Sequence, residues 1–387
     1  MGKRAALRVL LVSGAVLILF FSFGSRIPMP GAGAADLVRL QETDTSLEYN
    51  YDVFAGFCVN PSTTPTQGGG FFFYTKDGIK YMTASGEVWL DVPYSMTRPV
   101  ASGAGGVAAV SDRGKDLYVF DTRGLLYSKQ FEHTIVNFFV NSAGASAVLL
   151  DAKNLYRSQI FSAKGEEVFT YEHRDKNIFP AITSVSDDGK ICVLGFLDIN
   201  GTEITSSLYF GDIENQRIFS SLTLDKQMLL AVKFLGDQLI AVTDAGLSGI
   251  TLDTRAGETR VETSVPINNR IDMLSFFGEK GFVIALGDAL PGQEQAAARP
   301  SGTLLFFDAQ CSQTGEYSLG AKAALLRAAP GRVIAGANHT YYAFNAKGEL
   351  SWRYDAVSDL KDLLPLDADT VLVVTDTGAK VAKAVQG

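Results

Sequence analysis

Cysteine is nearly absent from this 387-residue chain, which contains only three. Cys58, Cys192 and Cys311 are odd in number and far apart, which argues against a disulfide framework. One pair could still close in an oxidising compartment. We expect instead that all three are buried thiols that act as small apolar side chains.

Histidine is equally scarce, and its spacing does not match a metal site. His133, His173 and His339 do not form a pattern such as HExxH. His133 and His173 follow FE and YE at matched positions of two repeats, which a shared role in a turn explains. No oriented nucleophile stands beside them for base catalysis. We therefore expect structural histidines, no catalytic residue and no bound metal.

Long apolar runs are also missing, except near the start. Val9–Ser25 holds 17 residues without a charge, enough to cover most of a bilayer core of roughly 30 Å. Basic residues precede it, so the positive-inside rule places residues 1–8 in the cytoplasm. We expect a transmembrane signal anchor at 9–25, a stalk at 26–35 and an extracytoplasmic domain at 36–387. The alternative is a signal peptide cleaved near Ala32–Ala34.

Positive charge is in deficit beyond that segment. The chain carries 34 basic and 42 acidic residues, and four of the basic ones lie within the first 26 residues. The remaining chain has a formal net charge of −12, which repels phosphate backbones and bare anionic membranes. We expect the membrane to be contacted through the N-terminal helix alone, and nucleic acid not to be a partner.

Helical periodicity is almost absent after residue 36, whereas a motif of strand, polar turn and strand recurs. Copies include YVFDTRGLLYSKQF from Tyr118, IFSAKGEEVFTYE from Ile160 and YAFNAKGELSWRYD from Tyr342. Each turn needs a residue that tolerates positive φ. We expect the turn residues to be Gly86, Gly124, Gly165, Asn215, Gly257, Gly315 and Gly348.

The number of repeats predicts the architecture. Two further strand signals precede each turn, and the turns lie 33 to 58 residues apart, which is typical of four-stranded propeller blades. Seven turns give seven blades and leave three strand signals in Leu360–Gly387. Leu37–Tyr51 can supply the missing strand by pairing with Ala379–Val385. We therefore expect an all-β protein with one propeller of eight blades, with seven as the alternative.

The turn motif also supports a family resemblance. AFNAKGELSWRYD resembles the repeat of pyrroloquinoline-quinone-like propellers, in which Trp stands on the outer strand. The match is best around Trp89 and Trp352, while Tyr127 and Phe169 stand near the Trp position elsewhere. The layout is similar to bacterial single-pass propeller families and to outer-membrane assembly propeller lipoproteins, although a lipobox cysteine is absent. Quinone enzymes of this superfamily commonly use adjacent cysteines, which this chain lacks, so we expect no cofactor.

Several polar segments are candidates for function. The acidic turn Ser186–Lys190 lacks the register of a calcium loop and reads as solvated. The insertions Asn60–Gly70 and Gly287–Gly302 should project from a propeller face, where binding loops tend to lie. One turn position repeats an acidic or amide residue, which favours a structural role over a unique catalytic pair. These residues are Asp121, Asp253, Asp308 and Asn345.

The sequence favours a non-catalytic binding, scaffold or sensor module at the bacterial cell envelope. Its expected partner is an envelope protein, a peptide or cell-wall material. The alternative is an extracytoplasmic enzyme, quinoprotein-like or glycan-active, that uses the central funnel. Two unpaired carboxylates in that funnel would favour the enzyme.

Overall fold

Thirty-two β-strands form the described part of the computed structural model, which comprises residues 37–49, 54–60, 69–291, 298–358 and 360–386. Within these residues no helix is long and apolar enough to span a bilayer. The predicted anchor at 9–25 and the stalk at 26–35 lie outside them. The residues from Leu37 onward make up one compact unit.

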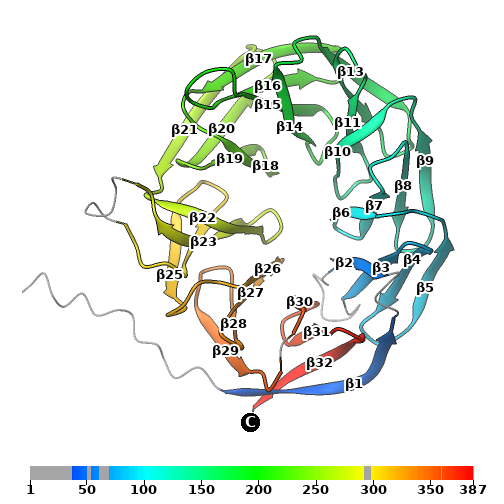
Figure 1. Cartoon of the computed structure of the whole chain (residues 1–387), viewed down its shortest axis with the longest axis vertical. Helices are drawn as coiled ribbons and strands as arrows, with labels where there is room; N and C mark the ends of the chain where they lie inside the picture. Colours follow the sequence, from blue (N-terminus) through cyan, green and yellow to red (C-terminus); the bar gives the residue numbers. More distant parts are fainter. Residues whose placement is uncertain (1–36, 50–53, 61–68, 292–297, 359, 387) are drawn as a thin grey trace, which may run out of the picture. The chain divides into compact units, whose positions relative to one another are not determined.

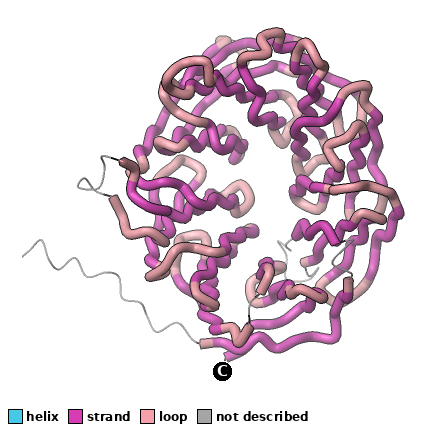
Figure 2. Tube along the Cα trace, in the orientation of Figure 1, coloured by secondary structure: helices cyan, strands magenta, loops and turns pink. Residues whose placement is uncertain are grey.

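The strands form eight antiparallel sheets of four strands each, arranged around one axis as the blades of a propeller (Figures 1 and 2). The innermost strands are β2 (Phe54–Asn60), β6 (Val100–Ala104), β10 (Thr134–Val140), β14 (Ile178–Val185), β18 (Leu229–Leu235), β22 (Asn269–Phe276), β26 (Leu325–Ala329) and β30 (Asp362–Pro365). The second strands are β3 (Gly70–Thr75), β7 (Val107–Ser111), β11 (Ser146–Asp151), β15 (Ile191–Asp198), β19 (Gln238–Thr243), β23 (Gly281–Ala289), β27 (Arg332–Ala337) and β31 (Thr370–Val374).

The outer half of each blade follows the same order. The third strands are β4 (Gly78–Thr83), β8 (Asp116–Asp121), β12 (Tyr156–Phe161), β16 (Thr205–Asp212), β20 (Gly246–Asp253), β24 (Thr303–Asp308), β28 (Thr340–Phe344) and β32 (Gly378–Gln386). The outermost strands are β5 (Val88–Pro93), β9 (Leu125–Gln130), β13 (Glu167–His173), β17 (Arg217–Leu224), β21 (Glu258–Pro266), β25 (Gln313–Ser318), β29 (Leu350–Asp355) and β1 (Val38–Glu48). Blades are numbered 1 to 8 from the one that begins with β2.

The ring closes through the two ends of the propeller, as the sequence predicted. β1 pairs antiparallel with β32, from Val38 opposite Gln386 to Glu48 opposite Gly378. The Thr43 hydroxyl donates to the Val381 carbonyl at 3.0 Å, and Lys380 Nζ lies 2.6 Å from Glu42 Oε2. The eight-blade prediction is confirmed, and the seven-blade alternative is wrong.

Apolar side chains fill each seam between neighbouring blades. Within the described residues eight buried clusters occur, and each joins two adjacent blades. The seam between blades 8 and 1 contains Phe71 and Val381, both about 1% exposed. This seam resembles the other seven in its packing, so burial of apolar surface stabilises the closure as it does each other seam.

Alternating strand direction gives the propeller two faces. The hairpin face carries the turns between first and second strands and between third and fourth strands. The linker face carries the remaining connections. The insertion Asn60–Gly70 follows β2 on the hairpin face, whereas Gly287–Gly302 starts within β23 and emerges on the linker face. Residues 61–68 and 292–297 of these insertions lie outside the described residues.

A β-bulge recurs between the third and fourth strands of every blade. In blades 1 to 7, the residue just after the bulge occupies what we call the docking position. In the seven blades it is held by Leu90, Tyr127, Phe169, Ser220, Thr263, Gly315 and Trp352.

The residues found at the docking position agree with the predicted Trp position of the repeat in three blades and differ from it in blade 1. Trp352, Tyr127 and Phe169 stand there and are buried, as the Trp-like pattern indicated. Trp89 does not, because Leu90 takes the position and Trp89 points the other way, 46% exposed. Side chains alternate along a strand, so a shift of one residue moves Trp89 to the outer surface.

Four of the seven predicted turn residues have the expected positive φ, namely Gly86, Gly165, Gly257 and Gly348. Gly124 and Asn215 lie in their turns as predicted but lack the expected positive φ, and the prediction for Gly315 is wrong. Gln216 has positive φ in place of Asn215, at 53°. Gly315 lies inside β25, and Cys311 takes the turn conformation at 60°.

Candidate functional site

The recurring acidic and amide residues stabilise the hairpin turns. Asp121 Oδ1 accepts hydrogen bonds from the backbone N–H of Arg123 and Gly124, both at 2.8 Å. Asp253, Asp308 and Asn345 each accept two backbone N–H bonds in the same way. Their side-chain oxygens replace missing backbone acceptors, which is the structural role that their recurrence predicted.

The inner wall of the ring carries two carboxylates on the described innermost strands, Asp272 and Asp362. Arg270 Nε donates to Asp272 at 2.6 Å, and Lys322 Nζ lies 3.2 Å from the same carboxylate. The hydrogen bond from Arg270 is the main reason that the pKa of Asp272 falls below its ordinary value. Arg327 donates to both oxygens of Asp362, at 3.0 and 3.1 Å. Both inner carboxylates are therefore paired.

The cysteines are free thiols in the described structure. Cys192 and Cys311 are buried, as predicted, while Cys58 on β2 is only partly shielded. Burial raises the pKa of Cys58 and Cys192 to about 12 and that of Cys311 to about 11. Thiols with such pKa values are poor nucleophiles near neutral pH.

The histidines occupy three different settings, so the shared turn role expected for His133 and His173 is wrong. His173 is the last residue of β13 and packs on Phe196, with ring centroids 4.4 Å apart. Burial lowers its pKa and favours the neutral ring. His339 lies in a turn with φ of 63°. His133 lines a surface groove. In the described residues no three His, Cys, Asp or Glu side chains gather as a metal ion would require.

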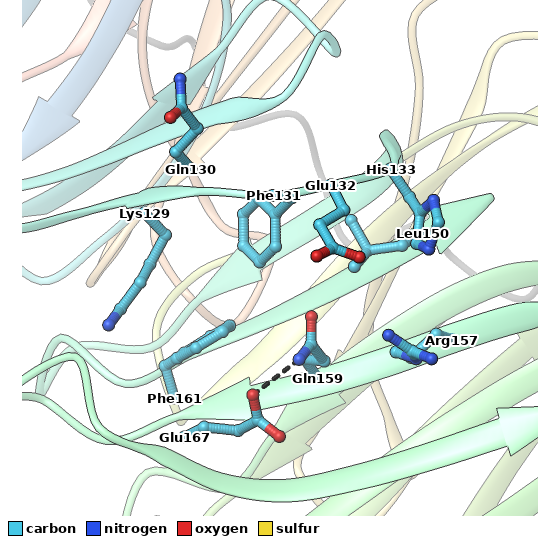
Figure 3. Close-up of a pocket in the computed structure, with 10 residues that line it drawn as sticks. All are labelled: Lys129, Gln130, Phe131, Glu132, His133, Leu150, Arg157, Gln159, Phe161 and Glu167. Carbon is cyan, nitrogen blue, oxygen red and sulfur yellow. Dashed lines mark hydrogen bonds between the residues drawn. The ribbon is translucent and has the colours of Figure 1, made fainter. Parts of the chain in front are cut away.

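The groove that contains His133 lies between blades 2 and 3 and encloses about 370 Å³. Its apolar floor consists of Phe131, Leu150 and Phe161, and the rings of Phe131 and Phe161 meet edge to face at 5.8 Å. Figure 3 shows Lys129 and Glu167 at one end and Glu132, His133 and Arg157 toward the other.

Most polar groups at the rim of this groove already have partners. Gln159 donates to Glu167 at 2.6 Å (dashed line in Figure 3), and the Thr170 hydroxyl donates to the other oxygen of Glu167 at 2.6 Å. Arg157 pairs with Glu172 at 2.9 Å. Lys129 Nζ lies 5.3 Å from the centre of the Phe161 ring, a cation–π contact.

Two further hollows adjoin this groove on the side of blade 4. One encloses about 220 Å³ and shares Phe161 with it, and the other encloses about 500 Å³ and shares Glu167 with it. The two hollows share Val168 and Ile213 with each other. We call the three together the blade 3 belt, because they surround the hairpin formed by β12 and β13.

Sequence reasoning missed this belt. The sequence pattern indicates a turn role for His133 and a solvated turn for Ser186–Lys190, and neither indicates a groove. The belt forms where residues from three blades meet, and its lining extends from Lys129 to Gln216. A pattern read along one strand carries no signal for such a surface.

Several solved structures share this architecture. BamB from Moraxella catarrhalis is 12% identical, with a TM-score of 0.51 over 89% of this chain and 100% of BamB. The computationally designed protein Ika8 is 15% identical, with a TM-score of 0.57 over 89% of this chain and 99% of its own. Chaetomium thermophilum Sqt1, solved bound to the N-terminus of the ribosomal protein L10, is 11% identical. Its TM-score is 0.53 over 89% of this chain and 100% of Sqt1.

These low identities establish the fold alone. The propeller part of the predicted resemblance is thereby confirmed, whereas a quinone-related repeat stays a prediction. A search of curated protein sequences returns no match. One family model matches the chain, over residues 61–383, and therefore covers most of the propeller. On that match the chain belongs to DUF5711, a family of unknown function.

Proposed function

We propose that the protein is a membrane-tethered binding module, whose propeller lies outside the cytoplasm and holds a protein partner of the cell envelope. Support for the tether comes from Lys3, Arg4 and Arg8, which precede the uncharged segment Val9–Ser25. Because β1 begins at Val38, such a segment would be joined through a short stalk to the strand that closes the ring.

The blade 3 belt is the observation that carries the binding role. It offers adjoining hollows with an apolar floor and a charged rim on a rigid β scaffold, which suits a protein or peptide ligand. Propellers of this architecture include Sqt1, which was solved with a segment of another protein bound. That likeness is one of fold, and the partner proposed here rests on the belt.

The enzyme alternative has less support. It required unpaired carboxylates on the inner wall, and Asp272 and Asp362 each face an arginine at hydrogen-bond distance. The recurring turn carboxylates are likewise engaged by backbone N–H groups.

A protease test on intact cells addresses the tether. We expect protease added outside wall-stripped cells to degrade the propeller and to leave a short membrane-bound N-terminal fragment, because residues 1–8 would lie inside. Immunoblotting with tags at either end measures both products. A protected propeller, or a mature protein that begins near Ala35 and is free of membrane, would contradict the tether.

The same cells test for a partner. An amine-reactive cross-linker that does not cross membranes should convert part of the full-length protein into a discrete larger adduct. If the protein stays unmodified at every cross-linker concentration, this result would count against a stable partner and hence against the binding role.

A further inference from the structure

We infer that the blade 3 belt binds an extended, basic peptide segment of the partner. The inference rests on the proposed binding function and adds to it a site and a class of ligand.

The shape of the belt favours an extended chain. Its three hollows share Phe161, Glu167, Val168 and Ile213, so they follow one another around the β12–β13 hairpin. A compact small molecule would fill one hollow and leave the others open. A peptide rises about 3.3 Å per residue in extended form, so successive side chains of one segment can enter successive hollows.

The floor accepts apolar side chains. Phe131, Phe161 and Ile213 line the belt and are between 3% and 8% exposed. An apolar side chain placed there would cover surface that no described part of this chain covers.

The charge of the belt selects a basic segment. Its lining carries five acidic residues, Glu132, Glu167, Asp187, Asp188 and Glu214, against two basic ones, Lys129 and Arg157. Arg157 is neutralised by Glu172, and Lys190 lies 3.5 Å from Asp188. Three acidic residues, Glu132, Glu167 and Glu214, therefore lack a cationic partner within the described residues, while Asp187 interacts with Lys233 of blade 5. Acidic peptides, nucleic acid and anionic lipid would all be repelled.

The test uses the full-length protein in phosphatidylcholine nanodiscs, with empty discs as the blank. Three fluorescein-labelled ten-residue peptides share two leucines and a serine framework, and carry four lysines, four glutamines or four glutamates. Fluorescence anisotropy measures their affinities. We expect the lysine peptide to bind about tenfold more tightly than the glutamine peptide, and the glutamate peptide to bind more weakly than either.

Charge reversal then locates the site. Glu132→Lys with Glu214→Lys changes two exposed belt residues and should weaken binding of the lysine peptide about tenfold. The control, Asp44→Lys with Glu279→Lys, makes the same change of net charge at exposed positions on blades 8 and 6. It should alter affinity less than about twofold. Circular dichroism confirms that both variants are folded.

Two results would overturn the inference. One is equal binding, or no binding, of the three peptides by the wild-type protein. The other is an equal loss of affinity in the belt variant and its control. This result would show that the net charge of the protein, and not the belt, determines the affinity for the peptide. If either occurs while the cross-linked adduct still forms in cells, the belt inference fails and the binding function stands. If the adduct is also absent, both fail.

Discussion

Gly315 and Gly124 stand at similar places in their repeats, but only Gly315 is required by a contact with the next blade. Both stand near the turns of repeated hairpins, and sequence alone assigned both to turns that need positive φ. In the structure neither has it. A Cβ on Gly315 would lie 2.2 Å from the Lys347 carbonyl oxygen of blade 7, whereas a Cβ on Gly124 would meet nothing within 4 Å. Gly315 is therefore needed for contact between blades.

The two glycines should respond oppositely to the same substitution. Gly315→Ala should destabilise the protein by roughly 1–3 kcal/mol, because the backbone of blade 7 must move away from the new methyl group. Gly124→Ala should be within about 0.5 kcal/mol of wild type. Urea unfolding midpoints measure both. Equal effects at the two positions would show that blade contact is not what requires Gly315.

At the scale of the element, the outermost strand determines how neighbouring blades pack. The docking position after the bulge directs a side chain into the next seam: a Cβ on Gly165 of blade 3 would lie 2.7 Å from the ring of Tyr127 of blade 2. Trp352 holds the same position in blade 7 and is 4% exposed, while Trp89 lies one residue before it in blade 1 and is 46% exposed.

The register of the two strands therefore predicts that replacing the two tryptophans by alanine destabilises the protein by different amounts. Trp352→Ala removes a large side chain from the seam between blades 7 and 8 and should destabilise by about 3–5 kcal/mol. Trp89→Ala removes a largely exposed ring and should cost less than about 1 kcal/mol. Chemical denaturation of the two variants compares them directly. A larger loss at Trp89 would mean that the docking position is misassigned.

The sequence predicted the strands, the repeat and the closing pair, because these depend on alternation and turn chemistry within short segments. Leu37–Tyr51 was matched to Ala379–Val385 from alternation and from the need to cover free edges, and the pairing of β1 with β32 agrees. The position of Trp89 was not predictable, since a bulge shifts register without changing composition. The belt was not predictable either, because it joins residues of three blades, and the positions of Gly315 and Cys311 depend on contacts between blades.

At the scale of the whole propeller, closure links its two ends without a covalent bond. Eight seams of similar apolar packing surround the axis, and the seam between blades 8 and 1 includes Leu47 and Tyr49 from the N-terminal end. Tyr49 Oη donates to the Thr375 carbonyl at 2.6 Å, which adds to the ladder between β1 and β32. A segment that anchors the chain before Leu37 would therefore be attached to the strand on which closure depends.

Paired truncations determine whether β1 is a structural part of the ring. We would delete residues 36–51, or residues 376–387, from the full-length protein and measure the urea unfolding midpoint of the propeller. Replacing residues 26–35 by a glycine–serine segment of equal length is the control, and it should leave the midpoint unchanged.

Both deletions should lower the midpoint by a similar amount, corresponding to several kcal/mol, because each removes one side of the same ladder and exposes the same seam. If deletion of residues 36–51 leaves the midpoint at the wild-type value while deletion of 376–387 lowers it, β1 does not close the ring and the eight-blade account is contradicted.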